Sequence, residues 1–464
     1  MFQVKSHKFK LQFSLFCVGM LMQISGILPF QNRLIAQSVP DVIPDSADLN
    51  TCLVYAMNHQ PLIQQLQINE EISRRDVGIA LSDWLPQIDL SGSFQKYVKQ
   101  PVSIFPDLSN PEGPKREITT GVKNTSAIQL NASQEIFNSD VFIAAKTSKY
   151  YRLRSSQATR QSKIQLVVQV SKAYYDILLS TAQMDFLQED FARQEKSMKD
   201  ARSQYEVGAS DKIDYQRASI SLNNIKAEMY GTREEIKAKY AYLKELMGYP
   251  SDQSLKVSYD SIRMMKDSWI DTFNVVDYHN RIEYQLLVTG LKLQKSNADY
   301  YKMGFLPELS AYANYNLVYQ NDALVDLYRS DFPNSSVGLR LSFPIFQGTK
   351  RIQQVKRANL QYQEMALDTL NMKSRMTTEY EQSMASYKSN LKAYEAALEN
   401  AQIASEVYST VRLQYNQGIK TYLEVIVSET DLRTSRINQL NALYRLLSSK
   451  IDVENALGNI SVNY

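Results

Sequence analysis

The stretch QYEVGASDKIDYQ, at Gln204–Gln216, has a counterpart in QYNQGIKTYLEVI, at Gln414–Ile426, and the two begin 210 positions apart. Both contain Gln-Tyr, two further residues and then Gly. The same spacing separates the motif LMG, which ends at Gly248, from the motif ALG, which ends at Gly458. Because a 210-residue period is too long for a solenoid, it indicates an internal duplication.

Two dipeptides also recur upstream of these motifs, each once in either half of the chain. Leu-Pro occurs at 85–86 and 306–307, and Ile-Phe occurs at 136–137 and 345–346. The sequence therefore predicts two internal repeats, each with a helix, two strands and a long helical hairpin. The hairpin tips fall near Gly208 and Gly418. The predicted boundaries are 37–250 for the first repeat, 251–276 for a linker and 277–464 for the second repeat.

The long arm of each hairpin carries a sustained apolar stripe in steps of three and four residues. Such spacing predicts helices that pack side by side as coiled coils. Ser180 and Gln194 interrupt the stripe in the first arm, and Ser405 and Arg412 interrupt it in the second. The stripe residues of the first arm are Leu166, Val170, Ala173, Ile177, Met184, Leu187, Phe191, Met198, Ala201 and Tyr205, and those of the second are Tyr380, Met384, Tyr387, Leu391, Tyr394, Leu398, Ala401, Tyr408 and Tyr415.

The lengths of the helical stretches suggest how they stack. The arm from Phe137 to Gly208 has 71 residues, or on the order of 105 Å of helix. The returning arm to Gly248 has 40 residues, and the helix before the first strand has about 35. We therefore expect one continuous helix to lie beside two shorter ones stacked end to end.

Four segments alternate apolar and polar residues with the period of a strand: 87–97, 127–137, 308–319 and 336–346. Strands of about ten residues with one apolar face suit a lipid-embedded barrel, although a half-buried sheet of a soluble protein has the same pattern. The stretches between paired strands, rich in Gly, Pro, Asn and Asp, are predicted to be loops. Four strands cannot close a barrel, so several chains must share one. Strand counting alone allows a dimer with eight strands or a trimer with twelve.

The N-terminus predicts export from the cytoplasm. Three lysines precede an apolar stretch at 11–30, and a plausible cleavage site follows Ala36, so 1–36 is predicted to be a signal peptide. Its removal would leave Cys52 as the single cysteine, which excludes an intramolecular disulfide. No later run of about 18 apolar residues could span a membrane as a helix, so an embedded part must be a barrel.

The composition disfavours nucleic-acid binding and catalysis. Lys and Arg number 52 against 49 Asp and Glu, so no strongly basic surface is indicated. The three histidines, together with the absence of a nucleophile elbow, a phosphate-binding loop or a Cys/His cluster, argue against an enzyme and against a cofactor. A soluble periplasmic coiled-coil scaffold remains the alternative. An enzyme acting on glycosidic bonds would need a carboxylate pair in a cleft, which nothing in the sequence suggests.

Over about 49–458 this layout resembles the TolC family of outer-membrane efflux and secretion ducts. The resemblance rests on the two Leu-Pro junctions, the SFPIFQG passage at Ser342–Gly348, the two YxxG elements and the duplication. It implies a mainly helical homotrimer, with a shared twelve-stranded barrel in the outer membrane and long antiparallel hairpins that form a periplasmic tube. It also implies contact with outer-membrane lipid, and a periplasmic adaptor protein and an inner-membrane transporter as partners. The duct would be passive, and partner binding would open its tip.

The resemblance further implies roles for residues at the hairpin tips. Tyr205 and Tyr415 match the family's tip tyrosines, and Asp214 matches an aspartate that bonds the second-half tyrosine, here Tyr415. Lys420 stands where the family often has an arginine. Glu424 matches one position of an acidic constriction ring, or else lies on a solvated helix face, while the second ring position is the apolar Val427. The segments expected to dock the adaptor are Val207, Gly208, Ala209 and Ser210 in the first half, and Gln417, Gly418, Ile419 and Thr421 in the second.

Overall fold

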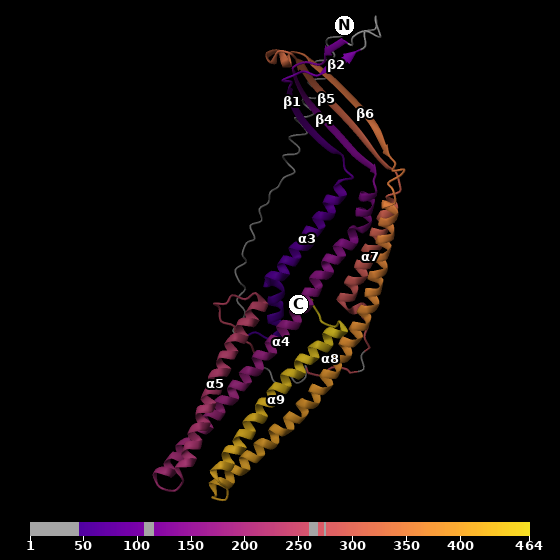
Figure 1. Ribbon diagram of the computed structural model, residues 1–464. Coiled ribbons are helices and arrows are strands. Elements are labelled where there is room, and N and C mark those ends of the chain that lie inside the picture. Colours follow the sequence, from indigo (N-terminus) through magenta and orange to yellow (C-terminus); the bar gives the residue numbers. More distant parts are fainter. Residues whose placement is uncertain (1–45, 106–115, 259–267, 273–274) are drawn as a thin grey trace. The chain divides into compact units, whose positions relative to one another are not determined.

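The computed structural model describes residues 46–105, 116–258, 268–272 and 275–464. The signal peptide predicted at 1–36 and the middle of the predicted linker at 251–276 lie outside these residues. Within the described part, the protein is mainly helical, with one four-stranded sheet and a small two-stranded hairpin (Figure 1).

The four-stranded sheet is antiparallel and joins strands from both halves of the chain. It contains β1 (Gln87–Lys96), β4 (Asn124–Phe137), β5 (Glu308–Asn321) and β6 (Asp331–Ser342) in the order β1-β4-β5-β6. All four predicted strands exist, but β6 begins five residues earlier and ends four residues sooner than the predicted 336–346. Its Pro333 is compatible with a strand because β6 lies at the edge of the sheet.

The connections between paired strands have more structure than the predicted loops. Between β1 and β4 the chain forms a hairpin of β2 (Val102–Phe105) and β3 (Arg116–Thr119). Between β5 and β6 it forms a short 3-10 helix, η2 (Leu324–Arg329). The turn-rich composition of these segments thus concealed short ordered elements.

The register of the sheet gathers apolar residues on one face and polar residues on the other. Leu90 lies opposite Leu130, which in turn lies opposite Tyr315. On the other face, Asn314 accepts a hydrogen bond of 3.0 Å from the Ser336 hydroxyl. The apolar face is uncovered in the single chain, since Leu90 is 72% exposed. The predicted alternation is therefore confirmed, and the apolar face is left exposed to its surroundings.

Each long helix packs against two shorter ones, as the lengths predicted. The helix α4 (Ser139–Glu206) contacts both α3 (Pro61–Ser82) and α5 (Lys212–Met247). The helix α8 (Lys350–Asn416) contacts both α7 (Ile282–Met303) and α9 (Tyr422–Leu457). The helix expected at about 51–84 is divided into α2 (Leu49–His59) and α3, and a short 3-10 helix, η1 (Tyr278–Asn280), precedes α7.

The returning helices end at glycines that press against the start of the neighbouring helix. A Cβ on Gly248 would lie 2.7 Å from the backbone oxygen of His59, and a Cβ on Gly458 would lie 3.0 Å from the backbone of Asn280. Arg281 ties the second of these joints together by donating to the Ala456 carbonyl at 2.9 Å. The motifs LMG and ALG thus mark the two points where the short helices meet.

The coiled-coil stripe is buried along most of α4 and α8, and its interruptions carry polar contacts. The Ser180 hydroxyl accepts from Lys239 Nζ at 2.7 Å, which links α4 to α5. Gln194 is 1% exposed and reaches α9. In the described residues, no helix is both long enough and apolar enough to cross a membrane.

Candidate functional site

The first hairpin tip is a helix-terminating turn built on the motif QYEVG. The Gly208 N–H donates to the Tyr205 carbonyl at 3.0 Å, and the Ala209 N–H donates to the Gln204 carbonyl at 2.7 Å. This pair of bonds is a Schellman motif, which needs a left-handed residue after the helix. Gly208 has φ of 74° and open space where a Cβ would be. The glycine is therefore required by its backbone angle and not by crowding.

The second tip repeats this arrangement. The Gly418 N–H donates to the Tyr415 carbonyl at 2.9 Å, the Ile419 N–H donates to the Gln414 carbonyl at 2.9 Å, and Gly418 has φ of 74°. The repeated Gln-Tyr-x-x-Gly pattern therefore has a local cause, because each of its fixed positions except the tyrosine ring takes part in the same turn.

The returning helices begin with side-chain caps. The Asp211 carboxylate accepts from the Ile213 N–H at 3.0 Å and caps α5. Thr421 and Glu424 form a capping box on α9, in which the Thr421 N–H donates to Glu424 Oε2 at 2.9 Å. Lys420 Nζ also donates to Glu424 Oε1 at 2.6 Å. The Lys420 bond, followed by the Thr421 bond, lowers the pKa of Glu424 to about 2.

Glu424 and Lys420 are thus engaged with each other and with the start of α9. The Glu424 side chain is 41% exposed in the single chain, which is compatible with a solvated helix face and with a ring facing a shared axis. Val427, at the second ring position of the resemblance, is 52% exposed. The capping box was not anticipated, although Thr421 followed three residues later by Glu424 is its usual signature.

Tyr415 has a partner other than the one predicted. Its hydroxyl donates to Gln204 Oε1 at 3.2 Å and so joins the second tip to the end of α4. Burial raises the pKa of Tyr415, and the nearby Asp214 carboxylate raises it further. Asp214 is therefore close to Tyr415, but the single phenolic proton goes to the amide of Gln204.

Tyr422 is a further tip residue, which was not among those predicted from the sequence. Its ring is buried with Ala201 of α4 and Ala218 of α5, so the first turn of α9 packs into the other hairpin. Its hydroxyl lies 3.1 Å from the Ser197 hydroxyl. Tyr422 is the first residue of α9, on the other side of the Gly418 turn from Tyr415, and no periodic signal in the sequence identifies it.

An open hollow of about 490 Å³ lies between the two tips. Its lining includes Gln204, Ser210, Asp214 and Tyr415, together with Thr421 of the second tip. The expected docking residues also include strongly exposed apolar side chains, since Val207 is 79% exposed and Ile419 is 66% exposed. Tyr205 is 40% exposed. The structure thus brings most of the expected gate and docking residues together at one end of the hairpins.

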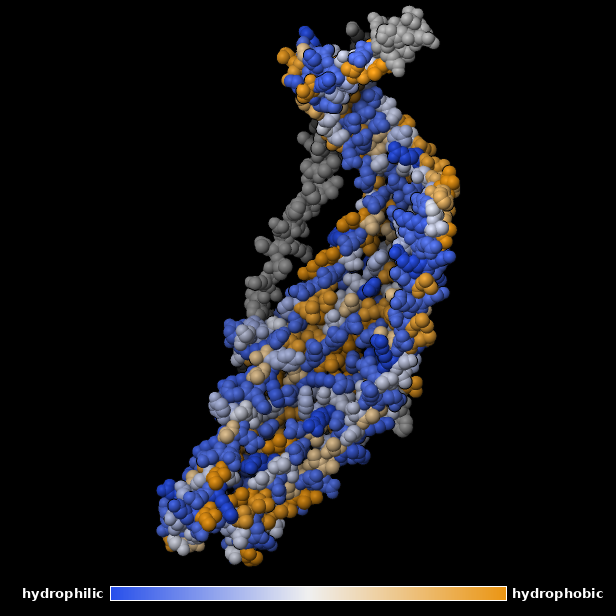
Figure 2. Space-filling model, viewed as in Figure 1, coloured by the Kyte–Doolittle hydropathy of each residue, from blue (hydrophilic) through white to orange (hydrophobic). Residues whose placement is uncertain are grey.

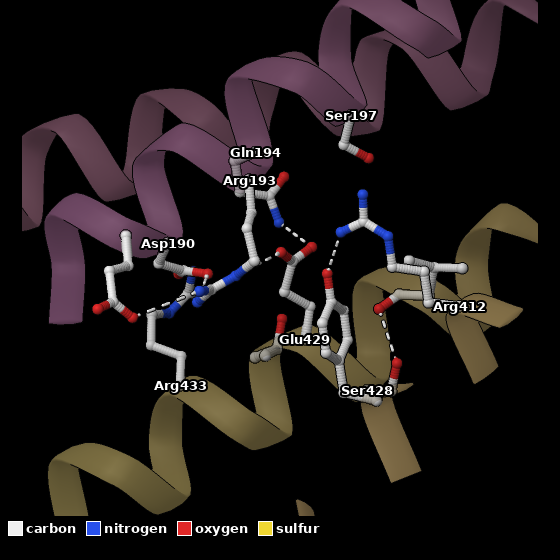
Figure 3. A network of polar contacts seen from close by, with 12 residues as sticks. Asp190, Arg193, Gln194, Ser197, Arg412, Ser428, Glu429 and Arg433 are labelled. Carbon is white, nitrogen blue, oxygen red and sulfur yellow. Dashed lines mark hydrogen bonds and ion pairs between the residues drawn. The ribbon is translucent and has the colours of Figure 1, made fainter. Parts of the chain in front are cut away.

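A buried polar cluster lies between the hairpins (Figure 3), about four turns before the end of α4. It joins Asp190 and Gln194 of α4 to Glu429 of α9, with arginines around them. No sequence pattern indicates the cluster as a whole. Two of its members, Gln194 and Arg412, nevertheless stood out as polar interruptions of an apolar stripe.

Comparison with known proteins identifies the family of the chain. A sequence profile of the family described as outer membrane efflux protein matches residues 53–249 and 288–459. The outer membrane protein TolC of Vibrio cholerae is 22% identical over 343 residues, which cover 72% of this chain and 76% of that protein. The alkaline protease secretion protein AprF of Pseudomonas aeruginosa is 21% identical over 330 residues, which cover 69% of this chain and 67% of that protein. The crystal structure of the Campylobacter jejuni CmeC outer membrane channel shares the fold, with a TM-score of 0.70, 18% identity and coverage of 90% of this chain and 87% of that chain.

Proposed function

The chain belongs to the outer membrane efflux protein family, and from this membership we infer how it assembles and which partners it has. It is an outer-membrane protein that serves as an exit duct for efflux or secretion, as its relatives do. The family is one of channels and not of enzymes.

We propose that three copies assemble into one twelve-stranded barrel. The observation that carries this proposal is the four-stranded sheet, which has two edges, β1 and β6, and an uncovered apolar face. In lipid, an unpaired edge would leave backbone groups without hydrogen bonds, so the edges must pair with other chains. Exposed apolar side chains continue at the passage from β6 to α8 (Figure 2), where Ile345 is 89% exposed and Phe346 is 84% exposed.

The helical hairpins would then form a tube in the periplasm, with the tips as its entrance. The similar order of elements in the two halves supports the internal duplication, and two hairpins per chain would give six tips per trimer. The exposed apolar residues Val207 and Ile419 support docking of a periplasmic adaptor protein at the tips. In this proposal the duct itself is passive, and an inner-membrane transporter would supply the energy.

The assembly can be tested by the mass of the mature protein extracted from outer membranes in detergent, corrected for bound detergent. A mass of three chains is expected. A soluble monomer or dimer in the periplasm would contradict the shared barrel and favour the coiled-coil scaffold.

A further inference from the structure

A buried polar cluster crosses the seam between the two hairpins. Figure 3 shows Glu429 extending from α9 toward Gln194 and Arg193 on α4. Asp190 is 1% exposed and Glu429 is 2% exposed, so two carboxyl groups are shielded from water in the same seam. Burying charged groups is costly unless they are fully paired. The partners of each carboxyl group therefore decide whether it is ionised or protonated.

Asp190 is well paired. Arg193 Nη2 lies 3.0 Å from Asp190 Oδ1, and Arg433 Nη1 lies 3.4 Å from Asp190 Oδ2. One arginine comes from α4 and the other from α9, so this ion pair by itself connects the two hairpins. Arg433 also approaches Glu228 of α5 at 3.9 Å.

Glu429 is paired incompletely. Its Oε2 contacts the Gln194 amide, but its Oε1 lies 4.0 Å from Arg193 Nε, which is too long for a hydrogen bond. Arg412 donates to the Tyr408 hydroxyl at 2.5 Å rather than to the carboxyl group. Within the described residues, Glu429 Oε1, Arg193 Nε and Gln194 Oε1 are buried without a hydrogen-bond partner.

The surroundings of Glu429 favour its neutral form. Burial is the main cause and the Asp190 charge adds to it, while three arginines act in the opposite direction; the balance raises the pKa of Glu429 to about 7. Its ordinary value of 4.5 would return if the seam parted and water reached the group. The charged and titratable groups that face the cluster are Asp190 and Arg193 of α4, Glu228 of α5, Tyr408 and Arg412 of α8, and Tyr422 and Arg433 of α9.

The cluster is connected to the tip by direct contacts. Ser197 lies three residues after Gln194 on α4 and contacts the hydroxyl of Tyr422. The Tyr422 ring lies 5.8 Å from the Tyr415 ring, and Tyr415 donates to Gln204 at the end of α4. Separation of α4 from α9 at the cluster would therefore disturb the same seam that holds the tips together.

We propose that Glu429 is a proton-operated latch between the α4/α5 and α8/α9 hairpins, closed when its carboxyl group holds a proton and loosened when it does not. The neutral carboxyl group can donate its O–H to the Gln194 carbonyl oxygen if the amide is turned, which uses an atom that now lacks a partner. The ionised group sits beside Asp190 without a full set of donors. This latch rests on the proposed function, since it regulates the entrance of the duct.

The direction of the pH dependence follows from the raised pKa. Between about pH 4.5 and pH 7 the closed seam holds a proton that the parted seam releases, so the seam weakens as pH rises through this window. Below pH 4.5 both states hold the proton and above pH 7 neither does, so the stability of the seam no longer changes with pH. Opening should increase across the window by on the order of 10²-fold if the parted seam fully hydrates Glu429.

The test is the open probability of the reconstituted trimer in planar lipid bilayers, with the pH on the hairpin side varied from 4.5 to 8. The wild type should open more as pH rises and should level off near pH 7. Glu429→Gln should abolish the rise, because its amide cannot ionise. Asp190→Asn should make the rise level off at lower pH, because it removes a charge that holds the proton on Glu429. Glu406→Gln, which changes an exposed glutamate of α8, is the matched control and should follow the wild type.

Three outcomes contradict the latch, and they differ from one another. If the wild type conducts and Glu429→Gln keeps the same pH profile, the latch is wrong and the duct stands. If the trimer does not conduct at any pH, the duct fails and the latch fails with it. An unshifted profile for Asp190→Asn, in a protein that still forms trimers, would show that the carboxyl pair does not control the proton.

Discussion

At the scale of single residues, the tips show how a short motif can combine a local requirement with a distant one. The glycine and glutamine backbones of QYEVG and QYNQG close a turn, which depends only on neighbours in sequence. The Tyr415 hydroxyl instead donates to Gln204, which is 211 positions away. The resemblance implied a bond from this hydroxyl to Asp214, whereas in the structure the hydroxyl donates to the amide oxygen of Gln204.

The Tyr415–Gln204 hydrogen bond is expected to help hold the closed tip. Tyr415→Phe removes its donor and Gln204→Leu removes its acceptor, so the two changes should both loosen the tip and should not be additive. Their coupling in a double-mutant cycle should be about 0.5–1 kcal/mol, because the bond is partly exposed. The open probability in planar bilayers measures it.

Asp214→Asn supplies the comparison for this cycle. It removes the charge near Tyr415 but leaves the Gln204 bond in place, so its coupling to Tyr415→Phe should be weaker. Stronger coupling to Asp214 than to Gln204 would restore the aspartate as the functional partner. Conductance equal to that of the wild type in all these variants would remove the tyrosine from the gate.

At the scale of elements, glycine has different structural roles at the tip and at the base of a hairpin. Gly208 at a tip has a positive φ and empty space around it. Gly248 at a base has a positive φ and also lies against the backbone of His59. The tip glycine therefore allows the backbone to form a turn. The base glycine also allows α5 to approach the break between α2 and α3 closely.

This difference predicts unequal costs of substitution. Gly208→Ala should lower the free energy of unfolding by about 1–2 kcal/mol, which is the cost of a left-handed conformation. Gly248→Ala should cost at least about twice as much, because its Cβ would also meet a backbone oxygen that cannot move freely. Urea denaturation in detergent measures both.

Gly231→Ala is the control for the pair of glycines. It lies inside α5 with open space where a Cβ would be, so alanine should be neutral or slightly stabilising there. Equal losses for Gly208→Ala and Gly248→Ala would show that the joint at His59 does not constrain the fold.

At the scale of the whole molecule, the sheet connects the two halves of the chain. One of its faces is apolar and is not covered by any other part of the described chain. Strands β4 and β5 pair directly, so the first and second halves share one sheet. One face of this sheet is apolar and uncovered, as expected for a face that meets lipid in an outer-membrane protein.

Adjacent residues of β6 test which face meets lipid. Val337 is 84% exposed on the apolar face, and its neighbour Ser336 contacts Asn314 on the polar face. Val337→Lys should destabilise the inserted barrel by about 2–4 kcal/mol if it lies near the middle of the membrane. Ser336→Lys should be tolerated, and the yield of trimer in outer membranes compares the two. A larger loss for Ser336→Lys would reverse the assignment of the faces.

Much of the fold was predictable because it depends on local pattern. The heptad stripe predicted the long helices, and the alternation at 87–97 and 308–319 predicted strands with one apolar face. The start of β6 was misplaced because Pro333 reads as a loop residue unless the strand is known to lie at an edge. The partner of Tyr415 and the burial of Glu429 were not predictable, because each depends on a helix from the other half of the chain.

The sequence alone therefore determined the long helices, the four main strands and the tip turns, since spacing along one helix, one strand or one turn is enough to specify each of them, and the order of these elements indicated the family. Only the tertiary structure decided which polar groups share the seam between α4 and α9. Asp190 and Glu429 are more than two hundred residues apart, and their coupling arises from the exclusion of water when two helices pack. A carboxyl group that looks like any other in the sequence thereby becomes one that can bind a proton near neutral pH.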